Sequence, residues 1–499
     1  MNAITTTTLL VALIFTAQLL FAQDNNHRLI ILADMGNEPD EVQQMVHMMM
    51  YSNEFDLEGL IAVTGKYLNP QQKRLYRRVL HPELFTGIID AYSEVVENLK
   101  KHATGWPEVE YLHSIVATGQ PEYGIAGTGG GKSSPGSELI IKSFLKDDNR
   151  PIYIVVNAGS NTLAQALIDF EAKYSQDELD AVIRKLRVFE NGAQDNAGAW
   201  ICSRFPDIHW IRSNYQTYCY GGPMPRTAEK LEVKGLKKGP HTWQPYAYSD
   251  LGQHQWTLEH VMAYHGSLGA YYPLRMMNNR LFFLEGGGTI PWLGLIHRGL
   301  ASIDHPSWGG WSGRFSREKV PNVWSRHQDI QQDEESYGGF KLYTEVADHW
   351  VDPATDSVYD NVFAPVYRWR QAFFNDFQCR MDWCVEDFEN ANHNPIAAIN
   401  GDRKEKIHTI RAEVGQTLQL DASASSDPDG DQIQYNWWVY KEASTYFNHI
   451  ALTGADQAVM SLQVPEDSHG KEIHLILEVT DDHEIASLHD YRRVVVEVE

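Results

Sequence analysis

Positive charge is scarce in this chain of 499 residues. It carries 42 lysine and arginine residues against 66 aspartate and glutamate residues, so its formal net charge is −24. A surface of that sign repels other polyanions, which argues against nucleic acid, anionic membranes and strongly sulphated polymers as partners. It is compatible with neutral glycans, cations and small uncharged substrates.

Cysteine is scarce as well. The chain has four cysteines, and none lies in a CxxC spacing; no HExxH sequence occurs either, so nothing indicates a zinc site. An oxidising compartment would permit disulfides, but four cysteines allow three pairings and the sequence does not choose among them. The four are Cys202, Cys219, Cys379 and Cys384.

Apolar runs long enough to span a bilayer comfortably are absent. The apolar segment at residues 9–22 has instead the length of a signal-peptide core. We predict cleavage after Ala22 and a secreted or periplasmic protein without a stable membrane anchor; an uncleaved anchor is the alternative interpretation. No Cys follows the segment, which argues against a lipid-anchored form.

The remaining composition is that of an ordinary folded protein, with 43% hydrophobic and 22% charged residues. The length allows roughly two to four domains. We predict a signal peptide at 1–22, a main domain at 23–389, a linker at 390–403 and a β-sandwich at 404–499.

The main domain is organised around residues 28–63. Apolar runs at 29–33 and 57–63 predict buried strands, and the three- and four-residue spacing of apolar residues at 42–50 predicts a helix between them. In such a βαβ unit the loop after the first strand lies at the carboxyl edge of the sheet, where α/β proteins bind ligands. Four carboxylates occupy this loop: Asp34, Glu38, Asp40 and Glu41. The plain alternative is that they only cap the helix N-terminus.

The alternation of strands and helices continues along the chain. Strands are predicted at 152–156, 186–189 and 208–211, and helices begin near Ser137 and at 163–170, include Trp200, and return at 367–385. We therefore predict an α/β fold with a mostly parallel, Rossmann-like sheet and helices on both faces. Short polar loops repeatedly follow the strands, which places them together at one edge of the sheet.

Two Gly-rich segments carry possible chemistry. Residues 124–137 end like a phosphate-binding loop, but the required earlier Gly is Ala126 and no strand leads in, so a flexible loop over a pocket is the better interpretation. Residues 304–314 combine Trp308, Trp311 and Arg314 with several glycines. Flat aromatic faces pack on sugar C–H groups, so this segment suits a sugar-facing loop and equally suits a cover over the core.

Beyond the linker the hydrophobic period changes to two. Alternating segments at 417–421, 432–440, 473–479 and 494–498 predict a small all-β sandwich of immunoglobulin type. The run Asp427-Pro428-Asp429-Gly430-Asp431 between them is explained by a turn and equally by a calcium loop.

The acid loop, spelled Asp34-Met35-Gly36-Asn37-Glu38-Pro39-Asp40-Glu41, resembles the first loop of nucleoside hydrolases. It looks closest to a secreted nucleoside hydrolase-like branch labelled cellulose-binding protein or domain of unknown function 1593. Asn157-Ala158-Gly159-Ser160-Asn161-Thr162 is similar to a turn that supplies metal-site backbone, and Gln194-Asp195-Asn196 to a loop that holds sugar hydroxyls. The residues of Trp308–Gly309–Gly310–Trp311, Arg314 and the C-terminal sandwich also fit this branch.

The resemblance implies roles for individual residues. Asp34 would contact a calcium ion and take a proton from the attacking water, Asp40 would bind a sugar hydroxyl or the ion, and Glu41 would be a further ligand. Substrate contacts are implied for Asn37, Glu38, Asn157, Asn161, Gln194, Asp195, Asn196, Trp308, Trp311 and Arg314. Calcium prefers six to eight hard oxygen ligands, which carboxylates and carbonyls provide.

The chain departs from the branch at two positions. Glu41 stands where the pattern has Asp, and Gly288 stands where a late acidic metal ligand is usual, unless Glu285 compensates. The acid that would protonate the leaving group is not evident, and Glu285, His265 and His297 are the candidates.

Three functions follow as alternatives. The first is a secreted glycoside hydrolase that cleaves an N- or O-glycosidic bond of an oligosaccharide or furanoside by metal-assisted attack of water. The second is a true nucleoside hydrolase, and the third is a carbohydrate-binding protein that has lost catalysis, which Gly288 favours. The partner would be a small or polysaccharide-derived saccharide, and an oligomer is compatible with the sequence.

Overall fold

A computed structural model describes most of the chain: residues 26–220, 256–273, 275–277, 280–282, 286–317, 342–353 and 356–499. The predicted signal peptide lies outside these residues. Among the helices of the described part, none is long and apolar enough to cross a membrane.

The main domain is built on an eight-stranded sheet with the order β3-β2-β1-β4-β5-β6-β10-β9. All neighbours pair in parallel except β9 and β10. This confirms the predicted α/β class. The strands are β1 His27–Ala33, β2 Phe55–Ala62, β3 Val116–Thr118, β4 Ile152–Val156, β5 Leu186–Asn191, β6 His209–Ser213, β9 Phe315–Ser316 and β10 Tyr343–Glu345.

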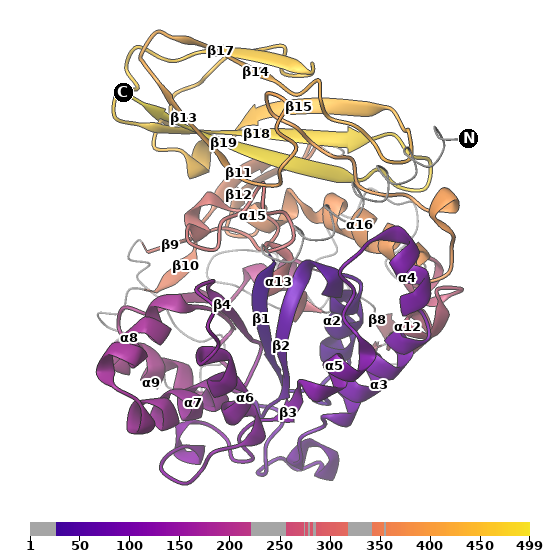
Figure 1. Cartoon of the computed structure of the whole chain (residues 1–499), viewed down its shortest axis with the longest axis vertical. Helices are drawn as coiled ribbons and strands as arrows, with labels where there is room; N and C mark the ends of the chain where they lie inside the picture. Colours follow the sequence, from indigo (N-terminus) through magenta and orange to yellow (C-terminus); the bar gives the residue numbers. More distant parts are fainter. Residues whose placement is uncertain are drawn as a thin grey trace, which may run out of the picture.

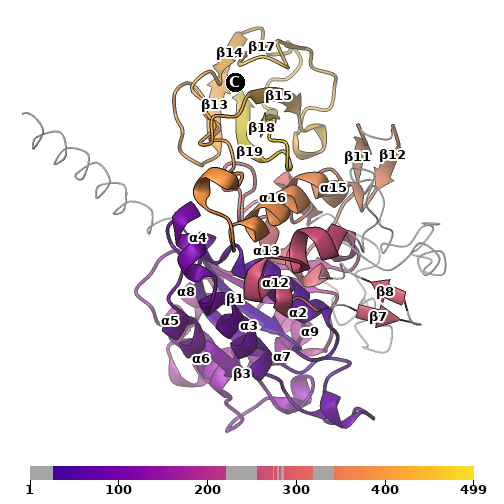
Figure 2. The ribbon, with the colours of Figure 1, turned by 90° about the vertical axis from the view of Figure 1, so that its right-hand side faces the viewer.

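Helices cover both faces of the sheet because both faces of its strands are apolar (Figures 1 and 2). In β1, Leu29 and Ile31 face one apolar core, and Ile30 and Leu32 face the other. The first core includes side chains of α2 Asp40–Met49, α3 Glu83–Ser93, α4 Val96–His102, α5 Val109–Ser114, α12 Gly266–Tyr271, α13 Ile290–Leu293, α15 Ala364–Tyr367 and α16 Arg370–Asp382. The second includes side chains of α6 Pro135–Phe144, α7 Ser160–Lys173, α8 Gln176–Lys185 and α9 Ala197–Arg204.

The helix predicted near Ser137 begins slightly earlier. Ser134 caps it, with its hydroxyl accepting from the Ser137 N–H and Pro135 at the first helical position. Such a cap satisfies backbone donors that have no partner within the helix. The four cysteines are buried and free.

The C-terminal part forms two small sheets around a separate core. One has the order β13-β19-β18-β15 and the other β14-β17-β16. Residues 390–403, predicted as a linker, pack into this part: Ala397 and Ile399 belong to its core. The strands are β13 His408–Ala412, β14 Thr417–Asp421, β15 Ile433–Val439, β16 Leu452–Thr453, β17 Val459–Gln463, β18 Glu472–Asp481 and β19 His489–Val498.

The β-sandwich sits against the amino ends of the parallel strands. Arg298 reaches Asn26, next to the start of β1, and also forms an ion pair with Glu405, 3.1 Å away, at the start of the sandwich. Figure 1 shows the sandwich at one end of the molecule and β3, α6 and α7 toward the other. The carboxyl ends of β1, β2 and β3 therefore point away from the sandwich, whereas the segment after β10 contacts it through Asp348 and Tyr440.

Candidate functional site

The candidate site lies where the strand order of the sheet reverses. The order runs β1, β2, β3 on one side and β4, β5, β6 on the other, so the loops after β1 and β4 diverge around a crevice. The Asn157 N–H donates to the Leu32 carbonyl over 2.9 Å, which fixes the two loops side by side. Ligands of open α/β sheets bind at this switch point, and Asp34 is the first residue after β1.

Asp34 is completely buried at the mouth of this crevice. Neither of its carboxylate oxygens accepts from an N–H or hydroxyl group of another residue in the described part of the chain; its own backbone N–H and the Glu41 carboxyl group are within reach. Gly65 makes the room: a Cβ there would lie 2.6 Å from Asp34 Oδ2. Burial, followed by the nearby charge of Asp40, raises the pKa of Asp34 to about 7.

Glu41 is the second buried acid, in the first turn of α2. Burial raises its pKa well above the usual range, and the charges of Asp40 and Asp34 act in the same direction. Two carboxyl groups this close hold one shared proton more easily than two charges. The helix N-terminus stabilises negative charge by at most about 2 kcal/mol, too little to explain a buried, coupled pair by capping alone.

Three amide side chains near the carboxyl ends of β4 and β5 make hydrogen bonds of the same kind. Each uses its NH2 group to hold a neighbouring loop: Asn157 donates to Gln44 Oε1 over 2.7 Å, Gln194 to the Asn157 carbonyl over 3.0 Å, and Asn161 to the Glu122 carbonyl over 2.8 Å. The side-chain oxygens of these three amides, and of Asn37, are buried and accept no hydrogen bond from the described part of the chain. The result is a set of acceptors that suits a cation or the hydroxyl groups of a sugar.

Two residues predicted to contact substrate fasten loops instead. Asp195 is fully buried and accepts from the Ser160 hydroxyl, from the Asn161 N–H at 3.2 Å and from the Ala197 N–H at 2.9 Å. Asn196 accepts from the Ile125 N–H at 2.9 Å. Asp195 therefore ties the loop after β4 to the loop after β5, and Asn196 ties the latter to residues 124–127.

Gly288 is close to this set, as expected for the position of the missing acid. A Cβ on Gly288 would overlap the side-chain oxygen of Gln44 and lie 2.5 Å from Asn157 Nδ2. Gln44 thus fills the space that an acidic side chain would need. Nothing local in the sequence indicates this contact, because Gln44 shares its helix face with the polar residues Asp40, Glu41 and His47 and lies 244 positions from Gly288.

The Trp-rich segment, predicted to face a sugar, lies away from the acid loop and contacts the C-terminal sandwich. Trp311 is 1% exposed and packs edge-on against His297. The Trp308 carbonyl accepts from Arg493 of β19 over 2.9 Å. Arg314 forms an ion pair with Asp348 at 2.6 Å, and Asp348 also accepts from Tyr440 of the sandwich. These residues build the joint between the two domains.

The structure places two of the three candidates for the leaving-group acid away from the acid loop and does not describe the third. Glu285 lies outside the described residues. His265 pairs with Asp382 of α16 at 3.0 Å, and His297 lies 3.8 Å from Asp490 in the sandwich. Both histidines therefore have structural partners away from the acid loop.

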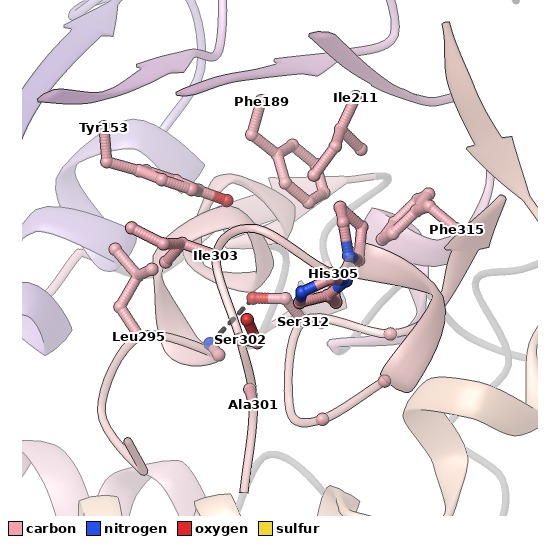
Figure 3. Close-up of a pocket in the computed structure, with 15 residues that line it drawn as sticks. Tyr153, Phe189, Ile211, Leu295, Ala301, Ser302, Ile303, His305, Ser312 and Phe315 are labelled. Atoms are coloured by element: carbon pink, nitrogen blue, oxygen red, sulfur yellow. Dashed lines mark hydrogen bonds between the residues drawn. The ribbon is translucent and has the colours of Figure 1, made fainter. Parts of the chain in front are cut away.

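A separate apolar cavity of about 40 Å³ lies between the sheet and residues 294–315. Figure 3 shows Tyr153, Phe189, Ile211, Leu295 and Phe315 around it. It contains none of the buried acids or amides of the crevice and is distinct from the candidate site.

Comparisons with known proteins agree with this fold. Residues 28–315 match the family model described as cellulose-binding Sde182, nucleoside hydrolase-like domain, and residues 417–498 match the C-terminal domain of cellulose-binding protein Sde0182. A solved structure from Saccharophagus degradans is 34% identical, with a TM-score of 0.78 over 95% of this chain and 100% of that one. It is described as a nucleoside hydrolase-related hypothetical protein associated with carbohydrate metabolism.

Two further comparisons add little. The titin M3 domain matches 21% of this chain and 96% of its own, with 11% identity and a TM-score of 0.13, which is too low to bear on the fold. No curated protein matches the chain.

Proposed function

Because the chain belongs to the Sde182 nucleoside hydrolase-like family, we propose that it is a secreted glycoside hydrolase that cleaves an N- or O-glycosidic bond of a saccharide. The observation that carries the proposal is the buried Asp34 carboxylate at the switch point, surrounded by acceptor oxygens. A structural carboxylate is normally held by donors from other residues, whereas in the described part of the chain this one has only its own backbone N–H and the Glu41 carboxyl group within reach.

Asp34 suits the role of general base. A base works best when its pKa lies near the working pH, and burial brings the pKa of Asp34 to about 7. In the proposed reaction Asp34 takes a proton from water as the water oxygen bonds to the anomeric carbon. The glycosidic bond breaks, and its electron pair leaves with the departing group. Negative groups nearby stabilise the oxocarbenium-like transition state.

The buried amides orient the sugar. Asn37, Asn157, Asn161 and Gln194 offer side-chain oxygens to hydroxyl donors, and the last three are held by hydrogen bonds from their NH2 groups to neighbouring segments. Glu38 and Asp40, only partly buried, are placed at the rim to bind further hydroxyls. Preformed acceptors of this kind place the anomeric carbon against Asp34 without a cost in reorganisation.

The donor set also fits a hard cation such as calcium. Asp34, Asp40 and Glu41 would hold it, with amide oxygens as neutral ligands. When bound, the ion would lower the pKa of a coordinated water and offset the charge of the acids. The set is weaker than a dedicated calcium site: among the described residues, these three acids do not form a group with one oxygen each within 4.8 Å of the others, and Gly288 offers no side chain.

A non-catalytic saccharide-binding protein is the second candidate, and the Gln44 side chain in the space beside Gly288 is the observation that favours it. A true nucleoside hydrolase remains the third, because the family fold is shared. Turnover of aryl glycosides, oligosaccharides and nucleosides, measured with calcium and with chelator, separates the three. Hydrolysis of a glycoside supports the proposal, hydrolysis of nucleosides alone supports the third candidate, and saccharide affinity without any product supports the second.

A further inference from the structure

One stretch of this acidic chain contains no acid at all. Between Glu58 and Glu83, residues 59–82 include no Asp or Glu but five cations: Lys66, Lys73, Arg74, Arg77 and Arg78. In a protein with a net charge of −24, this is a local cluster of positive charge. We refer to residues 66–79 as the basic rim.

The basic rim also exposes large apolar side chains. Leu75 is 75% exposed, Val79 57% and Tyr76 54%, and all three lie in or next to the short 3-10 helix Leu75–Arg78. Tyr67, at 39%, adds a second aromatic ring. Apolar side chains gathered in this way on a soluble protein usually mark a binding surface.

Four of the five positive charges of the rim are not neutralised by described carboxylates. Lys73, Arg74, Arg77 and Arg78 make no ion pair with a carboxylate in the described part of the chain. Arg77 donates to the Asn37 carbonyl and Arg78 to the Gln72 carbonyl, each over 2.6 Å, so backbone oxygens position them without neutralising them.

The rim borders the candidate site. The Tyr76 hydroxyl lies 3.2 Å from where a Cβ on Gly36 would be, two residues from Asp34. Asn37, held by Arg77, is one of the buried acceptors of the crevice. At the other end of the rim, Gly65 touches Asp34 and pairs with Leu68. The basic rim therefore adjoins the loop after β1 that carries Asp34 and Asn37.

We propose that the basic rim binds an anionic sugar unit, carboxylated or sulphated, of the saccharide whose neighbouring unit occupies the Asp34 crevice. This rests on the proposed function for the identity of the crevice, and it narrows the substrate class to acidic glycans. Arginine forks bind carboxylate and sulphate in a bidentate manner, and the ring of Tyr76 packs on the apolar face of a sugar.

A short acidic glycan fits the surroundings better than a long polyanion. The four acids of the loop after β1 lie directly beside the rim, and the protein as a whole is negative, so an extended nucleic acid or an anionic bilayer would be repelled within about 8–10 Å of the rim. One or two anionic units confined to the rim avoid that repulsion.

The test is binding to the full mature protein by calorimetry, with three probes of equal length: a cello-oligosaccharide, an oligogalacturonate and a sulphated galactan oligosaccharide. The variant Lys73→Gln/Arg74→Gln removes two rim charges, and Lys441→Gln/Lys471→Gln removes two exposed charges from the sandwich as the matched control. We expect the rim variant to bind at least one anionic probe about tenfold more weakly, with a reduced dependence on salt. The control is expected to match the wild type.

The two anionic probes distinguish carboxylate recognition from sulphate recognition, because a rim that is selective for one group loses affinity for that probe alone. Equal affinity of wild type and rim variant for both anionic probes overturns the inference, as does stronger rim-dependent binding to phosphatidylserine vesicles or single-stranded DNA. Asp34→Asn keeps the two proposals apart. If the wild type hydrolyses no saccharide but rim-dependent binding persists in Asp34→Asn, the proposed hydrolase fails and the rim proposal stands. If the wild type hydrolyses neutral saccharides and the rim variant binds the anionic probes as tightly as the wild type, the hydrolase stands and the rim proposal fails.

Discussion

The side-chain oxygen of Gln44 occupies the space in which a side chain on Gly288 would begin, and the same oxygen accepts from Asn157 Nδ2 over 2.7 Å. An amide oxygen of helix α2 therefore lies where the family resemblance places an acidic side chain. Compared with a carboxylate at this position, the Gln44 amide supplies an oxygen without a negative charge.

Restoring that acid alone is expected to damage the protein. Gly288→Asp forces atoms into Gln44 and Asn157, and overpacking of this kind costs about 1–3 kcal/mol of unfolding free energy. The double variant Gln44→Ala/Gly288→Asp is expected to recover most of that loss because it vacates the space. Chemical denaturation measures both. Gly130→Asp, at a glycine with nothing within 4 Å, is the control and is expected to change little; equal losses in the two single variants would contradict the packing argument.

Asp34→Asn is expected to reduce turnover of any glycoside the protein hydrolyses by at least about a hundredfold, because the amide cannot take the proton from water. Near-identical circular dichroism of the variant and the wild type would show that the fold survives. Full activity in a folded Asp34→Asn protein would remove Asp34 from the proposed mechanism.

The raised pKa of Asp34 predicts a particular dependence of stability on pH. Between its unfolded value near 4 and its folded value of about 7, the folded state holds a proton that the unfolded state has released, so this residue makes stability fall as pH rises. Asp34→Asn removes the effect. We expect the variant to gain about 1–3 kcal/mol over the wild type between pH 4 and pH 8 in metal-free buffer, and a constant difference across that range would rule out a buried, proton-holding Asp34.

Calcium is expected to stabilise the wild type in the same assay at pH 8, where the acids are charged and most need a counter-ion. Melting temperature with calcium and with chelator measures this without reference to activity. Asp34→Asn and Glu41→Gln are expected to lose most of the shift. A shift of the same size in all three proteins would place the ion elsewhere, for instance at Asp427, Asp429 and Asp431, whose carboxylates meet within 4.8 Å.

Asp195 is expected to act on the shape of the site and not on the chemistry. Asp195→Ala leaves the Ser160 hydroxyl and two N–H groups buried without their acceptor, at a cost of roughly 1–3 kcal/mol or more. The variant should raise KM more than it lowers kcat, since the loops that carry Asn161 and Gln194 separate. A variant that loses kcat alone at unchanged stability would instead support direct contact with substrate.

Much of the fold was predictable because its signals are local. The apolar runs that became β4 and β14 have the boundaries read from the sequence, 152–156 and 417–421. The position of Asp34 at the carboxyl edge of the sheet was predictable as well, because the loop after a buried parallel strand lies at that edge. These inferences need only periodicity and the geometry of parallel sheets.

The parts that could not be predicted depend on contacts between distant residues. Trp308 and Arg314 suited a sugar loop by residue type, yet Arg493 and Asp348 decide their role, and nothing in the local sequence announces those partners. Asp195 was assigned to the substrate for the same reason, since a carboxylate that fastens two loops reads like one that binds a hydroxyl. Whether such a residue contacts substrate or fastens a loop is decided by the residues that pack against it.

The contacts between the two domains determine which way the candidate site faces relative to the sandwich. Arg493 and Arg298 fix the sandwich to the amino-end pole of the sheet, while the crevice opens at the other pole. Any surface that holds the sandwich by its outer face therefore leaves the crevice pointing outward into solution. A protein held in this way would act on fragments that diffuse past it, and could not reach the material to which it is attached.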